Sequence, residues 1–246
     1  MRRTIVSGVT MALIAAASLV QAQAANNSPE AVAAFSAIIW TPAGALPQIV
    51  RAQRTFNSGA RGDVALQYGR YKLNALADEI KNIGLTGGVR VTRRFRLGAT
   101  IGRESCSSCD GLTMGGVDLS ASLFHKGASA DVGGDTDVGL LVRAGMGKAD
   151  TSDVTARSLV LSLPLAVSLE QVENSVLTLY LSPSAAYGSL ADNGVTLGGW
   201  RPMIGAGLGY QFGFGLGVHA AAHKVILDDS PTHFGLAVSW QFGGKH

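Results

Sequence analysis

Residues 233–242 read His-Phe-Gly-Leu-Ala-Val-Ser-Trp-Gln-Phe, a strict alternation between two kinds of side chain. The even positions hold large apolar residues, and the odd positions after the histidine hold Gly, Ala, Ser and Gln. Successive side chains of a β-strand point to opposite faces, so this segment predicts a strand with one apolar face and one small, polar face. Soluble sandwiches and membrane barrels both use such strands, and the rest of the chain must distinguish them.

Nine further segments upstream repeat the pattern, and most have about the 9–11 residues that a tilted strand needs to cross a bilayer. Nearly half of the residues are hydrophobic, but no internal run is long enough for a transmembrane helix. The sequence therefore predicts an all-β fold, an antiparallel up-and-down transmembrane β-barrel of about ten strands over residues 62–242, with eight strands as the alternative. The predicted strands are residues 63–72, 84–92, 95–101, 114–124, 137–147, 155–169, 176–187, 200–212, 214–224 and 233–242.

The connections between these strands give a predicted topology. If the chain ends in the periplasm, the connections must alternate between the two sides of the membrane. Residues 93–94, 125–136, 170–175 and 211–215 then lie on the periplasmic side. Residues 74–82, 103–112, 148–154, 189–199 and 226–232 lie on the outer side, the first of these as a short amphipathic helical excursion.

Charged residues fall on the small, polar face of the predicted strands. A charge facing lipid near the middle of the membrane costs roughly 2–4 kcal/mol, whereas charges inside a barrel can pair with one another. We therefore expect these side chains to point into the lumen. The predicted lumen charges are Asp63, Arg90, Arg96, Asp118, Arg143 and His219.

The chain begins with the features of a cleaved signal peptide over residues 1–24. Arg2 and Arg3 precede an apolar stretch, and Ala22-Gln23-Ala24 offers a small-residue cleavage site. Residues 25–61 are predicted to form an N-terminal periplasmic or plug segment with a short helix, and residues 243–246 a C-terminal tail. Removing the two arginines lowers the formal net charge from +3 to about +1, so nucleic acid is not an expected partner.

Cys106 and Cys109 form a single Cys-x-x-Cys pair, which is compatible with a redox pair, half of a zinc site or a local disulfide. The sequence has neither a surrounding βαβ pattern nor a second cysteine pair to complete a zinc site. In an exported protein the local disulfide is favoured. No cofactor and no metal are predicted.

The pattern His233-x-Gly235-x-x-Val238-x-Trp240 resembles the signal by which the outer-membrane assembly machinery recognises the last strand of its clients, and Phe242 continues the aromatic face. The chain thus resembles the small bacterial outer-membrane β-barrel proteins, although four residues follow where many of them end on the aromatic residue. The resemblance implies location in the bacterial outer membrane, with its lipid and the barrel assembly machinery as partners and small solutes as possible ligands.

The sequence favours the first of three functional hypotheses and predicts that the protein is not an enzyme. The first is a non-enzymatic envelope protein with a structural, narrow-pore or surface-loop interaction role. The second is a surface hydrolase using Asp228 or Asp229 with a nearby histidine, against which stands the lack of a Gly-x-Ser-x-Gly nucleophile pattern. The third is a soluble periplasmic β-protein that binds an apolar ligand.

Overall fold

A computed structural model describes residues 61–72, 79–92, 94–105, 112–128, 136–150, 154–170, 175–192, 195–226 and 232–243. The regular structure within these ranges is β-strand. The described residues contain no helix long and apolar enough to cross a membrane. The strands are β1 Gly62–Lys72, β2 Glu79–Arg90, β3 Phe95–Ser105, β4 Leu112–Ala128, β5 Thr136–Asp150, β6 Val154–Ser162, β7 Leu165–Glu170, β8 Val176–Asp192, β9 Val195–Gln211, β10 Leu216–Val225 and β11 Thr232–Phe242.

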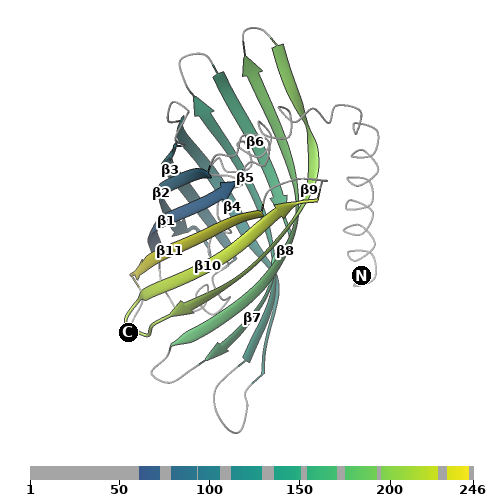
Figure 1. Cartoon of the computed structure of the whole chain (residues 1–246). Helices are drawn as coiled ribbons and strands as arrows, with labels where there is room; N and C mark the ends of the chain where they lie inside the picture. Colours follow the sequence, from purple (N-terminus) through teal and green to yellow (C-terminus); the bar gives the residue numbers. More distant parts are fainter. Residues whose placement is uncertain are drawn as a thin grey trace, which may run out of the picture.

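The strands pair antiparallel with their neighbours in the chain, and the sheet closes on itself. β1 pairs with β2 on one side and with the last strand, β11, on the other. β4 pairs with β5, which joins the first half of the sheet to the second. Figure 1 shows the tilted strands following one another around the curved wall. The predicted antiparallel up-and-down barrel is confirmed.

β6 and β7 share one position in the sheet, between β5 and β8. They are separated only at Leu163 and Pro164, and the pairing register with β8 is the same on both sides of this interruption. The Leu163 N–H donates to the Pro183 carbonyl at 2.9 Å. Pro164 and Pro183 have no N–H group, so the ladder of backbone hydrogen bonds is interrupted there. The eleven strands therefore fill ten positions, and residues 155–169 act as the single strand that the sequence predicts.

Large apolar side chains cover the outside of the barrel. Leu66, Leu85 and Val238 lie in register on β1, β2 and β11, and each exposes about half of its surface, 50–55%. Their neighbours Gln67 and Ser239, on the opposite face, are only 3% and 1% exposed. This distribution is the reverse of a soluble sandwich, in which the leucines and valines would pack between two layers. The hypothesis of a soluble β-protein with such a core is therefore wrong.

Several strands extend into segments predicted as connections. Glycine and polar residues lowered the strand signal there, but ladder hydrogen bonds to neighbouring strands hold them in the sheet, because β-propensity is weaker than tertiary context. β8 and β9, for example, continue until Asp192 faces Val195. The corrected connections are residues 103–112, 125–136, 148–154 and 189–199, which all lose residues to strands, and residues 74–82, of which 79–82 begin β2 rather than a helix.

The long strands gather on one side of the barrel. β4, β8 and β9 have 17 residues each and β5 has 15, whereas β1, β2, β3, β10 and β11 have 10 to 12. About 9–11 residues suffice to cross the hydrocarbon region, so the long strands exceed what crossing needs. In Figure 1 this taller wall extends beyond the short strands at both ends.

Two tight turns lie at the end of the barrel where β1 begins and β11 ends, here called the proximal end. Between β2 and β3, the Thr92 hydroxyl accepts hydrogen bonds from the N–H groups of Arg94 and Phe95, each at 3.2 Å. Between β9 and β10, Gly215 adopts a φ of 104° that favours glycine. The predicted short turns between β2 and β3 and over residues 211–215 are confirmed.

Candidate functional site

The proximal part of the lumen contains a buried ion cluster formed by Asp63, Arg96 and Asp118. Arg96 donates to both carboxylate oxygens of Asp63, at 2.9 Å from Nε and 2.8 Å from Nη2. Its third nitrogen, Nη1, lies 3.4 Å from Asp118 Oδ2. The three side chains come from β1, β3 and β4, and the exposed fraction of each is 12% or less. A bidentate arginine shared by two carboxylates is a strong, geometrically specific contact.

The other three predicted lumen charges come from β2, β5 and β10. Arg90 is in register with Arg96 across β2 and β3 and is partly buried. Arg143 lies on β5, opposite Ser120 of β4. His219 lies on β10, where its Nε2 is 3.0 Å from the Ser239 hydroxyl. The structure thus joins three of the six residues into one cluster and distributes the rest around the wall.

A second buried group lies near the distal end, where β1 ends and β11 begins. The Tyr71 hydroxyl donates to Glu104 Oε1 at 3.3 Å, and the Tyr71 ring stacks on His233 with centroids 4.2 Å apart. His223 of β10 is in register with His233 of β11 and is also buried. The sequence prediction missed Tyr71 and placed Glu104 in a loop. Tyr71 lies an even number of residues from Asp63 on β1, and Glu104 an even number from Arg96 on β3. The period of two would therefore have placed both side chains on the inward face.

Bulky lumenal side chains rest on glycines of adjacent strands. The Tyr180 ring lies over Gly207, the His223 ring over Gly205 and the Arg96 guanidinium over Gly88, since a methyl group added at any of these glycines would collide with the side chain. The alternating glycines of β9 thus let the barrel close around bulkier neighbouring side chains. Glycine is needed here for close approach rather than for backbone freedom.

We expect Gly207→Ala to lower the free energy of unfolding by about 1–3 kcal/mol, the usual cost of overpacking. The added methyl group would lie 2.5 Å from Tyr180 Cζ. Urea titration of the barrel refolded in lipid vesicles measures the effect. The matched control is Gly87→Ala, whose nearest neighbour would be the Asp63 carbonyl oxygen at 3.7 Å. We expect this control to change stability by less than about 0.5 kcal/mol. Equal losses in the two variants would contradict the packing argument.

The predicted assembly-signal residues divide between the two faces of β11. Val238, Trp240 and Phe242 point outward and are about half exposed, while His233 and Gly235 face the lumen and are buried. Residues 1–60 and the pairs Cys106/Cys109 and Asp228/Asp229 lie outside the described residues, so the predictions made for them stand as predictions. Among the residues that the structure describes, no group of three or more His, Cys, Asp or Glu side chains could hold a metal ion.

No protein-family model and no curated protein matches the sequence. Solved structures do match. Ail of Yersinia pestis is 10% identical, with 74% of this chain and 99% of Ail covered and a TM-score of 0.32. The N-terminal β-barrel domain of Pseudomonas aeruginosa OprF is 14% identical, with 74% and 98% covered and a TM-score of 0.32. LpxR from Salmonella typhimurium is 11% identical, with 67% and 73% covered and a TM-score of 0.39.

The membrane assignment rests on the side-chain distribution of the chain itself. A closed antiparallel sheet satisfies its backbone polar groups internally, which hydrocarbon requires of any spanning structure. Its outside presents exposed leucine, valine and aromatic side chains, and its inside holds a buried arginine–aspartate cluster. The chain is therefore a small transmembrane β-barrel of the bacterial outer-membrane type.

Proposed function

We propose that this barrel has a non-enzymatic, structural role, with its lumen closed by its own side chains and its distal loops held at the membrane surface. The observation that carries the proposal is the burial of small polar side chains on many strands of the lumen. Thr86 on β2, Ser158 on β6 and Ser168 on β7 are only 3–5% exposed. A water-filled channel would hydrate such groups.

Hydrogen bonds between inward side chains support a closed lumen. The hydroxyls of Thr86 and Thr100, which are in register on β2 and β3, lie 2.8 Å apart. The Gln241 amide of β11 donates to Gln211 Oε1 of β9 at 3.0 Å, crossing the intervening β10. Side chains that satisfy one another replace the water that a conducting lumen would contain.

A narrow pore is the second candidate. It is favoured by the way in which Arg96, Tyr180 and His223 lie along the wall over neighbouring glycines rather than straight toward the barrel axis. Such packing draws bulky side chains away from the centre of the lumen. The two candidates make opposite predictions about ion flow.

We expect the purified full-length protein to show no stepwise conductance in planar lipid bilayers, because its inward polar groups are buried. A general porin inserted by the same procedure is the positive control, and heat-modifiable migration on gels verifies that the barrel is folded. Reproducible single-channel steps from the folded protein would contradict the closed lumen and support the narrow pore.

The absence of enzymatic activity is part of the same proposal. The hydrolase hypothesis needs a histidine beside Asp228 or Asp229 at the outer surface. His223 and His233, the histidines nearest to them in sequence, face the lumen with exposed fractions of 8% and 1%. Hydrolysis of ester or peptide substrates that is abolished by Asp228→Ala or Asp229→Ala would overturn this part of the proposal.

A further inference from the structure

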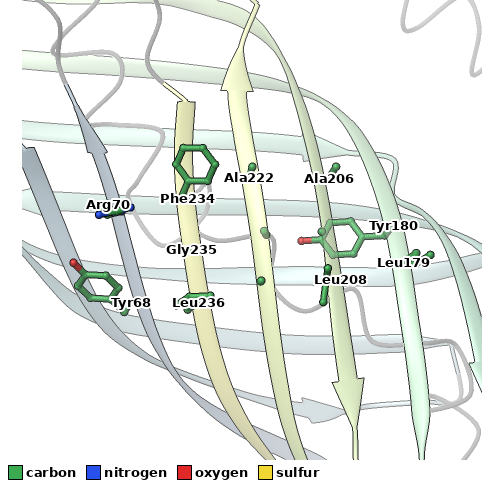
Figure 2. A pocket seen from close by; sticks show the side chains of 13 residues that line it. Tyr68, Arg70, Leu179, Tyr180, Ala206, Leu208, Ala222, Phe234, Gly235 and Leu236 are labelled. Carbon is green, nitrogen blue, oxygen red and sulfur yellow. The ribbon is translucent and has the colours of Figure 1, made fainter. Parts of the chain in front are cut away.

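A groove of about 770 Å³ runs along the outside of the barrel over β10. Figure 2 shows Phe234 and Leu236 of β11 on one side of it and Leu208 of β9 on the other. Its volume lies within the range of roughly 300–1,000 Å³ that is typical of ligand pockets. The outward side chains that line it come from five adjacent strands and include Arg70, Leu179, Ala206, Leu208, Phe234 and Leu236.

The groove arises from a step in side-chain size around the outer wall. The outward positions of β10 at mid-height hold Ala220 and Ala222, which are in register with Leu236 and Phe234 of β11. Ala220 is also in register with Leu208 of β9. Ala222 is in register with Ala206 of β9. Three methyl groups thus form a floor bordered by the taller side chains of Phe234, Leu236 and Leu208. Around Leu66, by contrast, leucine and valine side chains stand in register on three strands.

Basic side chains surround the distal end of the groove. Arg70 lines it directly, and Lys224 lies on the outward face of β10, two residues beyond Ala222. Lys72 is the next outward residue after Arg70 on β1, and all three are exposed. Arg70 is in register with Ala222 through Phe234, and Lys224 lies two residues further along β10. With strands about 4.8 Å apart and about 3.4 Å per residue, the backbones of Arg70 and Lys224 are about 12 Å apart.

One acidic side chain partly offsets this charge. Glu79 of β2 lies 3.5 Å from Arg70 Nη1 through Oε1 and 3.7 Å from Lys81 Nζ through Oε2. Lys81 adds a fourth exposed cation on the same side of the barrel. The four cations and Glu79 give the described residues around this end of the groove a net charge of +3. An apolar groove that ends in a cationic rim matches a molecule with an acyl chain and an anionic headgroup.

We propose that the groove binds one acyl chain of an anionic, phosphate-bearing lipid, with the lipid phosphate held between Arg70 and Lys224. Basic residues near a membrane surface each contribute about fivefold to the binding of anionic lipid, equivalent to about 1 kcal/mol. A second copy of the barrel fits less well. A two-fold axis along the membrane normal would bring the cationic rims of both copies together at one depth, which is unfavourable.

The test measures lipid retained by the full-length barrel. Protein refolded into vesicles of equal phosphatidylglycerol and phosphatidylcholine, with identical acyl chains, is extracted and examined by native mass spectrometry. We expect one phosphatidylglycerol per barrel, preferred over phosphatidylcholine by about 30-fold. The variant Arg70→Gln/Lys224→Gln should lose this preference, and Ala220→Phe should lose retention of both lipids because the ring fills the groove.

Two matched variants separate the site from general membrane contact. Arg103→Gln removes an exposed outward charge from the distal part of β3, and Ala99→Phe fills an outward alanine of β3 away from the groove. Both should retain lipid like the wild type. An unchanged preference in the double glutamine variant would overturn the proposal, and so would equal losses in Ala99→Phe and Ala220→Phe. A two-copy species without lipid would also overturn it, since a second barrel would then occupy the groove.

Discussion

Replacing Arg96 by methionine should lower the free energy of unfolding by about 3–5 kcal/mol, the typical loss when one partner of a buried ion pair is removed. Methionine keeps most of the apolar stem but removes the guanidinium, which lies over Gly88 and joins Asp63 to Asp118. Both carboxylates then stay buried without the cation that they share. Urea-induced unfolding of the refolded barrel in lipid vesicles measures this loss.

Two further variants show whether the loss comes from charge. Adding Asp63→Asn and Asp118→Asn to Arg96→Met removes the stranded carboxylates and should recover much of the stability, because replacing a whole buried ion cluster by neutral groups is often nearly neutral. Arg103→Gln, on the exposed face of the same strand, should change stability by less than about 0.5 kcal/mol. A loss below about 1 kcal/mol in Arg96→Met would contradict a cluster that acts as one unit.

The alternation of side chains was sufficient to predict the barrel and the direction in which each strand residue points. Val238 faces out and Ser239 faces in because the period of a strand is two, whatever its partners are. Strand ends were predicted less well. Asp192 has little local preference for a strand, and its place in β8 depends on pairing with Val154 of β6, which is distant in the sequence.

Alternation alone does not predict which inward side chains contact one another. Asp63 and Arg96 are 33 residues apart and lie on strands separated by β2. Their contact needs the register that sets Asp63 opposite Gly88, because any larger residue at that position would block the guanidinium. The groove was missed for a similar reason. Ala220 and Ala222 are visible in the sequence, but the depth of the groove depends on Phe234 and Leu236 of the next strand.

Placing arginine at Leu66 should lower the free energy of unfolding by about 2–4 kcal/mol when the barrel is refolded in a phospholipid bilayer. Leu66 lies at mid-height of β1, between Leu85 and Val238 in the outer apolar band, and exposes 55% of its surface. In a soluble protein, so exposed a position would accept arginine at little cost. The size of the loss therefore tests directly whether this face meets hydrocarbon.

The control for this experiment is an arginine at a position that lies at a different depth in the membrane. Val91 is even more exposed, at 64%, but lies in the tight turn at the proximal end, where an arginine can reach water. Val91→Arg should therefore cost only about 0–1 kcal/mol. Leu66→Ala, which removes bulk without adding charge, should also cost less than Leu66→Arg. If arginine were equally harmless at positions 66 and 91, the outer apolar surface would not face lipid, and the orientation of every strand described above would have to be reconsidered.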